Sequence, residues 1–291
     1  MSRRAKRPSN PYIELMKPRI LMMVLITATI GFYLGGMGIH HWPTFFWMLV
    51  GVALSSGGAG ALNHYLERDI DSLMPRTRNR PLPSGKVRPQ HALMMGTYMV
   101  IAGVMVLVWQ VNLMTGFLAL MTAFLYVLVY TPMKRLSWWN TPIGAIPGAL
   151  PPLGGWAAAT GGQLDTGAWV LFAIMFVWQH PHFYAIAWMF REDYREGGLK
   201  MLTVVDPSGR RAFRQTISLA VLLIPLSLVP VYLGLSGPLY AVGMVLLGLA
   251  FVWPCARLML TRTTADARSV LRMSVIYLPL WLILFVIDFN F

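Results

Sequence analysis

The sequence predicts an all-α polytopic membrane protein, with nine transmembrane helices forming one integral-membrane domain over residues 1–291. Of its 291 residues, 56% are hydrophobic and only 12% are charged, whereas about a quarter of the residues of a soluble domain are charged. The apolar residues also fall in runs of about 20, the length that a transmembrane helix needs. Backbone groups in hydrocarbon must bond to each other, and these runs are far longer than the roughly ten residues of a barrel strand. Helices are therefore the expected spanning elements.

The nine expected spans follow one another with short connections. They run over residues 20–39, 43–66, 92–111, 113–131, 141–160, 167–190, 214–234, 238–257 and 270–288. The connections at 40–42, 112, 161–166 and 236–238 contain no Lys or Arg, so all 24 basic residues fall on the other side. Positively charged connections stay in the cytoplasm, which predicts a cytoplasmic N-terminus and an outer C-terminus. The net charge of +13 then indicates orientation in a lipid bilayer rather than binding to nucleic acid.

The start of the chain favours a bacterial inner membrane. The first ten residues, MSRRAKRPSN, are basic but short, and the first apolar run is too long for a signal-peptide core. We expect no Arg- and Ser-rich transit sequence. The single Cys255 excludes an internal disulfide and a multi-cysteine metal site.

The fifth span, TPIGAIPGALPPLGGW, is rich in Pro and Gly and is expected to be kinked or broken. Two interpretations are open. The small residues can allow close packing between helices, or a bent wall can open a cavity for a long apolar substrate.

The candidate active site begins at the end of the second span, in the run NHYLERDIDSLMPRTRNRPLP over residues 63–83. Asn63, Glu67 and Asp71 are four residues apart, so they share one face of a helix. Mg²⁺ prefers one or two carboxylates together with waters and phosphate oxygens. Acids within a span are costly and usually functional. The alternative is a solvated helix end with Arg–Asp pairs.

Other charges in the same run are candidates for related roles. Asp69 points away from the Asn63 face if the helix continues through it, although Pro75 indicates that the helix ends soon after. Three arginines are candidate diphosphate ligands, as are two basic residues after the fourth span that can also be membrane anchors. These five residues are Arg68, Arg76, Arg80, Lys134 and Arg135.

A second acidic cluster, REDYREGGLK, follows the sixth span over residues 191–200. Four spans separate the two clusters, which predicts that both lie on the cytoplasmic side. Asp193 is the preferred second metal position, with Glu192 and Glu196 as competitors. The alternative is an ordinary charged loop.

Three histidines are candidates for binding a substrate. His64 lies within the first cluster, whereas His180 and His182 lie deeper in the sixth span, beside Gln179. An imidazole there can ligate haem iron or handle a proton. It can equally be a buried structural residue.

These residues resemble the UbiA-like intramembrane prenyltransferases. That family has an Asn-x-x-x-Asp-x-x-x-Asp motif after its second span, matched here by Asn63, Glu67 and Asp71 with Glu in the middle position. An Asp-rich second motif follows its sixth span, and Gly197 stands here where the second Asp would be. The resemblance extends from about Tyr12 to Phe289. The runs that carry it are KPRILMM, NHYLERDIDSLMPRTRNRPLP, YTPMKR and WQHPHFYAIAWMFREDYREGG, which are most similar to the haem-farnesylating branch.

The resemblance implies a nine-helix bundle around a lipid-open cavity and a transferase reaction dependent on Mg²⁺. A farnesyl group would pass from farnesyl diphosphate to the vinyl group of haem B, with addition of water, to give haem O and diphosphate. The implied metal residues are Asn63, Glu67, Asp71 and Asp193. The pathway also implies partnership with a downstream haem A synthase or with terminal oxidase assembly.

Two rival functions share parts of this pattern. The first is prenylation of an aromatic acceptor such as 4-hydroxybenzoate in quinone synthesis, which would use the same metal residues. The second is transport of an anionic lipid or of haem. Transporters place coupling charges near the bilayer midplane, whereas both acidic clusters here flank one membrane face.

Overall fold

The computed structural model describes residues 10–289, and its regular structure there is helical apart from one isolated bridge between Ser236 and Phe289. The long helices occur in the order that the sequence predicts, which confirms the fold class. They are α2 (Pro18–Gly35), α3 (Trp42–Leu73), α4 (Pro89–Gln110), α5 (Leu113–Phe124), α7 (Asn140–Ala159), α8 (Thr166–Met189), α11 (Arg210–Tyr232), α12 (Pro238–Thr261) and α13 (Thr264–Ile287).

Eight helical segments of residues 10–289 are long and apolar enough to cross a membrane, so the chain is a multi-pass membrane protein. One of them is the run Leu113–Leu136, in which α5 continues through the π-helix η1 (Leu125–Tyr130) into α6 (Thr131–Leu136). The fifth expected span corresponds to α7, which is long enough but is not among the eight. The count of nine therefore stays a prediction.

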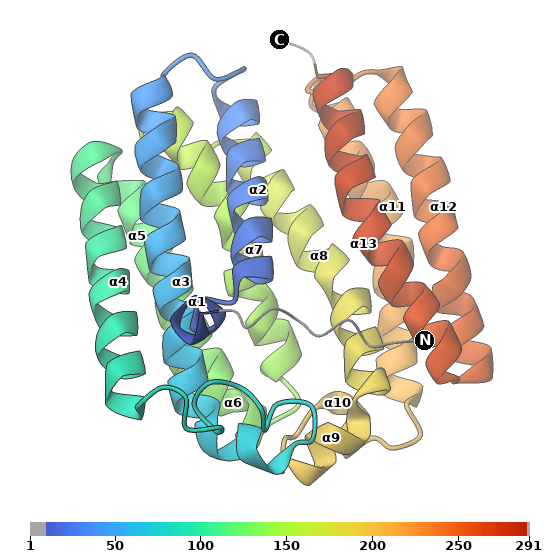
Figure 1. The fold of residues 1–291 in the computed structure, drawn as a ribbon. Helices are drawn as coiled ribbons and strands as arrows, with labels where there is room; N and C mark the ends of the chain where they lie inside the picture. The colour runs from blue at the N-terminus through green and yellow to red at the C-terminus, as the bar shows by residue number, and fades with distance from the viewer. Residues whose placement is uncertain (1–9, 290–291) are drawn as a thin grey trace, which may run out of the picture.

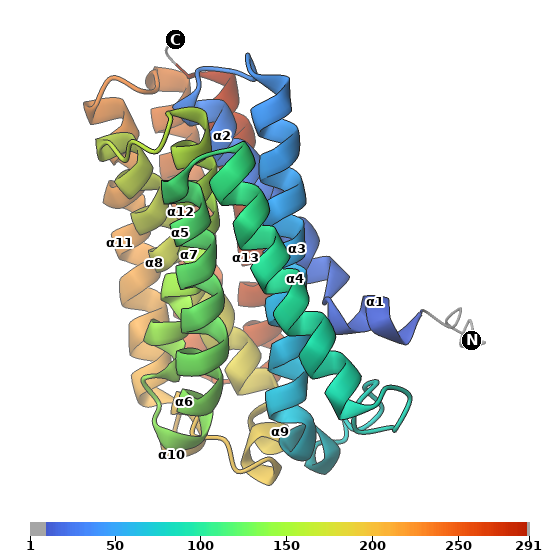
Figure 2. The same cartoon turned by 90° about the vertical axis from the view of Figure 1, so that its left-hand side faces the viewer.

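The helices form two groups joined through α8 (Figures 1 and 2). In the first group, α2 packs on α7 and α3, and α3 packs on α4. In the second group, α12 packs on α11 and α13, and α8 contacts α7, α11 and α13. The ribbons of α2 and α13 stand apart in Figure 1.

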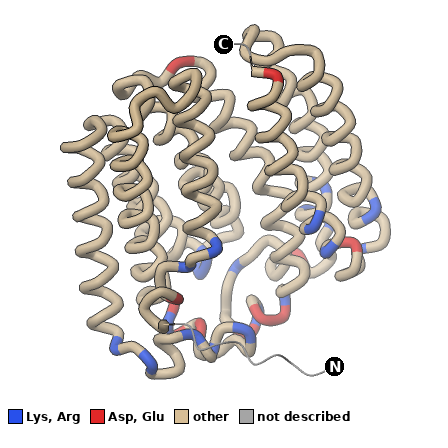
Figure 3. Tube along the Cα trace, turned by 45° about the horizontal axis from the view of Figure 1, so that its top comes forward, with Lys and Arg blue, Asp and Glu red and all other residues tan. Residues whose placement is uncertain are grey.

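Three short helices lie at one end of the bundle: α6, α9 (Arg191–Glu196) and α10 (Leu202–Val205), whereas α1 (Pro11–Leu15) lies at its side, farther from that end. Figure 3 shows that the Lys and Arg residues of the described part of the chain also concentrate at this end. The predicted segregation of charge is thus confirmed, and it places both acidic clusters at the same end. We call this end the basic end.

The prediction of a break in the fifth span is wrong, because α7 is one continuous helix with Pro147, Pro151 and Pro152 inside it. Hydrocarbon offers no water to replace lost backbone hydrogen bonds, so a spanning helix persists through prolines. The glycines support the close-packing interpretation. A methyl group at Gly155 would collide with the carbonyl of Ala28 in α2, and one at Gly31 would collide with the carbonyl of Pro152.

Substituting Gly155 with Ala is expected to lower the free energy of unfolding by about 1–3 kcal/mol, because overpacking forces the two backbones apart. Gly154→Ala is the matched control, since a methyl group there would meet no atom within 4 Å. Thermal unfolding of the purified proteins in detergent measures both effects. Equal melting temperatures for the two variants would contradict this view of the α2–α7 contact.

Candidate active site

Asn63, Glu67 and Asp71 form a polar ladder along the last turns of α3, at the basic end. Only 0%, 8% and 1% of these residues is exposed, so the ladder is buried. The alternative of a solvated helix end is therefore excluded for these three side chains. Buried polar and charged groups are costly unless they are paired, and the rest of the site consists of their partners.

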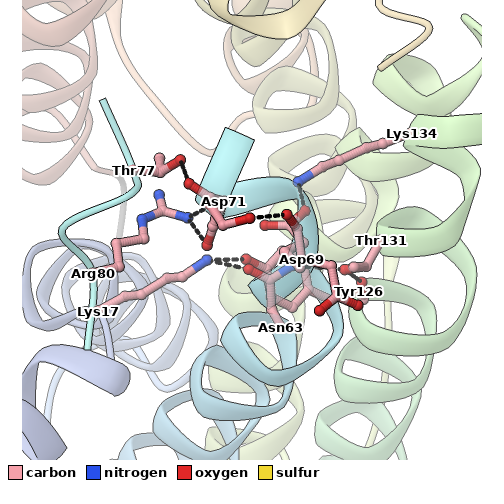
Figure 4. Close-up of polar contacts among 11 residues, drawn as sticks. Lys17, Asn63, Asp69, Asp71, Thr77, Arg80, Tyr126, Thr131 and Lys134 are labelled. Atoms are coloured by element: carbon pink, nitrogen blue, oxygen red, sulfur yellow. Dashed lines mark hydrogen bonds and ion pairs between the residues drawn. The ribbon is translucent and has the colours of Figure 1, made fainter. Parts of the chain in front are cut away.

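A basic side chain meets each member of the ladder (Figure 4). Lys17 donates a hydrogen bond from Nζ to Asn63 Oδ1. Lys134 Nζ lies 2.6 Å from Glu67 Oε1. Arg80 reaches both carboxylate oxygens of Asp71 through Nη1, each at 2.8 Å.

The three basic residues come from separate parts of the chain. Lys17 lies between α1 and α2 with a left-handed backbone, φ 53°, immediately before Pro18. Arg80 lies in the turns after α3, where the Thr77 hydroxyl donates a 2.9 Å hydrogen bond to the backbone carbonyl of Asp71. Lys134 lies in α6. The ladder is thus the point where three distant segments meet.

The π-helix η1 positions the neighbours of Asn63. Thr131, directly after η1, accepts a 2.8 Å hydrogen bond from Asn63 Nδ2 and donates one of 2.8 Å to the Tyr126 carbonyl. Tyr130 stacks under Lys134, whose Nζ is 4.5 Å from the ring centroid. π-Helical turns within α-helices are frequent at functional sites.

Asp69, Arg68 and Arg135 do not join the ladder. Asp69 is exposed and lies 3.7 Å from Arg68 Nε, as expected for a residue on the far side of α3. Arg68 donates to the Tyr65 carbonyl and stacks on the Tyr65 ring. Arg135 is exposed, and no contact of its side chain is seen within residues 10–289.

The second cluster meets the first through Asp193. Its carboxylate lies 3.6 Å from Arg76 Nε, and the Arg76 guanidinium stacks on Phe190 at 4.8 Å. Glu192 instead pairs with Arg191 and Arg195. The segment after α9 also holds α6, because the Lys200 backbone N–H donates a 2.7 Å bond to the Lys134 carbonyl. The two clusters therefore lie on facing sides of one region, as the topology predicts.

An apolar cavity of about 150 Å³ adjoins this region. Its lining includes Tyr130, which stacks on Lys134, and Tyr194, which follows Asp193. The remaining lining residues are Thr141, Phe183, Ile186 and Met201. Tyr130 and Tyr194 therefore lie between the charged groups and the apolar cavity.

The three candidate histidines lie in different surroundings. His64 is buried, and its Nδ1 has no hydrogen-bond partner among residues 10–289. His180 Nδ1 donates to the Phe176 carbonyl at 2.6 Å, and the ring lines a separate cavity of about 370 Å³ with Arg214. His182 Nδ1 is 2.8 Å from the Ser274 hydroxyl of α13. Positions 180 and 182 are about 200° apart around a helix, so they do not face one pocket.

The donor atoms of the ladder suit a hard cation. They are one amide oxygen and two carboxylates, and Mg²⁺ takes one or two carboxylates while water and phosphate oxygens supply the other positions. No group of three or more His, Cys, Asp or Glu is placed to hold a metal within residues 10–289. The site therefore fits a metal that arrives with a phosphate, rather than one held by protein ligands alone.

Several residues of the site were not singled out from the sequence, above all Lys17 and Tyr126. Lys17 Nζ also donates to the Tyr126 hydroxyl at 3.1 Å. The run KPRILMM carries Lys17 as part of the family resemblance, but sequence spacing gives no signal that it meets Asn63, 46 positions later. Only the packing of α1 and α2 against α3 makes that contact.

Comparison with known proteins bears on this geometry. The model of the UbiA prenyltransferase family matches residues 24–278. The chain belongs to this family. Its relatives include the protoheme IX farnesyltransferase of Solibacter usitatus (strain Ellin6076), 48% identical over 92% of this chain and 95% of the relative. The protoheme IX farnesyltransferase of Salinibacter ruber is 44% identical over 95% and 98% of the two chains.

Solved structures share the UbiA fold. A digeranylgeranylglyceryl phosphate synthase superimposes with a TM-score of 0.78 at 19% identity, covering 96% of this chain and 97% of the other. A UbiA homolog from Archaeoglobus fulgidus, bound to DMAPP and Mg²⁺, has a TM-score of 0.70 at 15% identity and covers 93% and 99%. The bundle described above is therefore the fold of this family.

Substituting Arg80 with Gln is expected to destabilise the protein by about 3 kcal/mol, because it leaves the buried Asp71 carboxylate without its cation. Arg68→Gln is the matched control. Its surface pair with Asp69 is expected to contribute at most about 1 kcal/mol. Thermal unfolding of both variants tests the assignment. A loss in Arg68→Gln equal to that in Arg80→Gln would show that Asp71 does not depend on Arg80.

Proposed function

We propose that this protein transfers a farnesyl group from farnesyl diphosphate to the vinyl group of haem B, with addition of water, giving haem O and diphosphate. The observation that carries this proposal is the buried ladder, where two carboxylates and an amide meet three basic side chains beside an apolar cavity. Two relatives that match nearly the full chain are protoheme IX farnesyltransferases, which supports haem as the acceptor.

Asn63, Glu67 and Asp71 would hold Mg²⁺, and Asp193 is the candidate for a second position. The ion would supply neutralising charge for the diphosphate as the allylic carbon–oxygen bond ionises. Lys134 and Arg80 now neutralise the two carboxylates. With a cation on those carboxylates, both basic side chains would be available to the leaving diphosphate and would stabilise it through charge-assisted hydrogen bonds.

Arg76 is the further basic residue of this diphosphate site, because it lies between Asp193 and the rings of Phe190 and Tyr194. Arg68, Arg135 and Asp69 face away from the ladder, so we assign them no contact with the substrate. The farnesyl chain would extend from the charged region into apolar surroundings. Such surroundings keep water from the allylic cation until the acceptor attacks.

For haem we favour His182 as the iron-binding residue. Its neighbour Phe183 lines the cavity beside Tyr130, which connects this turn of α8 with the diphosphate site. The Ser274 hydroxyl holds Nδ1, so the ring is oriented with Nε2 as the available nitrogen. His180 lines the other cavity, between α7, α8 and α11, and His64 follows Asn63 directly in α3.

The basic end would face the cytoplasm of a bacterial cell, with the protein in the inner membrane. The concentration of Lys and Arg at that end supports this orientation. The diphosphate site then opens to the compartment of soluble Mg²⁺ and diphosphate. A downstream haem A synthase or terminal oxidase assembly would receive the product.

The acceptor is tested by incubating the purified protein with Mg²⁺ and labelled farnesyl diphosphate, together with either haem B or 4-hydroxybenzoate. We expect labelled haem O and no labelled aromatic product. Product from the aromatic acid alone would contradict the proposal and favour a role in quinone synthesis. Movement of haem across sealed vesicles, without release of diphosphate, would favour transport.

Two substitutions are expected to separate the diphosphate site from the haem site. Glu67→Gln should lower turnover by at least about 10²-fold, the scale for removing electrostatic stabilisation of a developing charge. It should leave the Soret band of bound haem unchanged. His182→Ala should change the Soret band and weaken haem binding, measured by titration with haem B.

His180→Ala is the control for the second substitution, since both histidines lie in the same part of α8. A Soret change in His180→Ala but not in His182→Ala would move the haem to the other side of that helix. Loss of haem binding in Glu67→Gln would contradict a separate diphosphate site.

A further inference from the structure

Lys17 differs from the other two basic side chains that meet the ladder. Lys134 and Arg80 each pair with a carboxylate, whereas Lys17 meets the neutral amide of Asn63 and the Tyr126 hydroxyl. Within residues 10–289 it forms no ion pair. Its ammonium group therefore adds a third positive charge to a ladder that has two carboxylates.

The backbone fixes where this charge lies. Lys17 has φ 53°, in the left-handed region that residues with a Cβ rarely occupy. Pro18 begins α2 directly after Lys17, and the Lys17 backbone N–H donates to the Glu14 carbonyl of α1. The connection between α1 and α2 thus directs the Lys17 side chain into the bundle, whereas the next basic residue, Arg19, is exposed.

Asn63 Oδ1 is both the acceptor for Lys17 and a proposed metal ligand. An ammonium and a divalent cation that approach the same oxygen atom repel each other. Lys17 and the metal therefore compete for Asn63 Oδ1. A diphosphate bound beside the metal is negatively charged, so it attracts the Lys17 ammonium instead of repelling it. Lys17 has three N–H donors and no acceptor atom, which suits it to phosphate oxygens once Asn63 is taken.

We propose that Lys17 is a diphosphate-binding residue that is held on Asn63 until metal and diphosphate arrive together. This inference rests on the proposed function. It implies that Lys17 weakens the binding of a metal ion alone and strengthens the binding of the metal–diphosphate complex. Such coupling means that the metal ion and the diphosphate bind more tightly together than either binds alone.

The test measures two affinities on the full-length protein in lipid nanodiscs. Mn²⁺ alone is titrated and followed by the electron paramagnetic resonance of the free ion. The preformed complex of Mn²⁺ with inorganic pyrophosphate is titrated by calorimetry. In Lys17→Met we expect Mn²⁺ alone to bind about fivefold more tightly and the complex about tenfold more weakly, within the usual range of coupling between ligands.

Arg19→Met is the matched control, because Arg19 lies two positions after Lys17, is exposed and forms no ion pair within residues 10–289. Both of its affinities should stay within about twofold of wild type. Lys17→Arg keeps the positive charge and should retain binding of the complex. Retained binding would also show that the protein folds with a substitution between α1 and α2. Melting temperatures are compared for all variants.

Three outcomes would overturn the inference: both affinities falling in Lys17→Met, neither changing, or Arg19→Met behaving in the same way. The first would make Lys17 a structural residue, and the last would make the effect one of general surface charge. If wild type binds Mn²⁺ but not the pyrophosphate complex, the diphosphate role in the proposed function fails as well. If wild type binds the complex and Lys17→Met binds it with the same affinity, only the role of Lys17 fails.

Discussion

The pairing of buried acids with basic side chains at one end of the bundle is the interaction on which the site depends. Glu67 and Asp71 are nearly inaccessible, and a buried carboxylate without a cation would cost several kcal/mol. Lys134 and Arg80 supply those cations from segments far away in sequence. The fold can therefore be understood as the arrangement that brings those segments to the last turns of α3.

Packing deep in the bundle supports this arrangement. The close approach of α2 to α7 requires Gly155 and Gly31, where backbone carbonyls of the opposite helix leave no room for a Cβ. That contact fixes α2, and the start of α2 carries Lys17. The fourth span contributes in a similar way, because its π-helix precedes Thr131 and Lys134. Small residues and irregular helix geometry thus help to position Lys17, Thr131 and Lys134 at the basic end.

Much of this architecture follows from the sequence, because hydropathy and loop charge report directly on membrane helices. The spacing of Asn63, Glu67 and Asp71 predicted one face of a helix, and Asp69 on the other. Three features depend on tertiary contacts instead: the left-handed Lys17, the π-helix, and the pairing of Arg76 with Asp193. The break expected from the prolines of α7 does not occur, because their local preference is overridden in hydrocarbon. The separation of His180 from His182, by contrast, follows from 3.6 residues per turn.

We infer that the ladder exchanges its basic partners for a metal when diphosphate binds. A structure determined with Mn²⁺ and a non-hydrolysable farnesyl diphosphate analogue tests this directly. We expect Mn²⁺ on Asn63, Glu67 and Asp71, with Lys134 and Arg80 moved from the carboxylates to diphosphate oxygens. Carboxylate pairs that stay intact, with the diphosphate bound elsewhere, would contradict it.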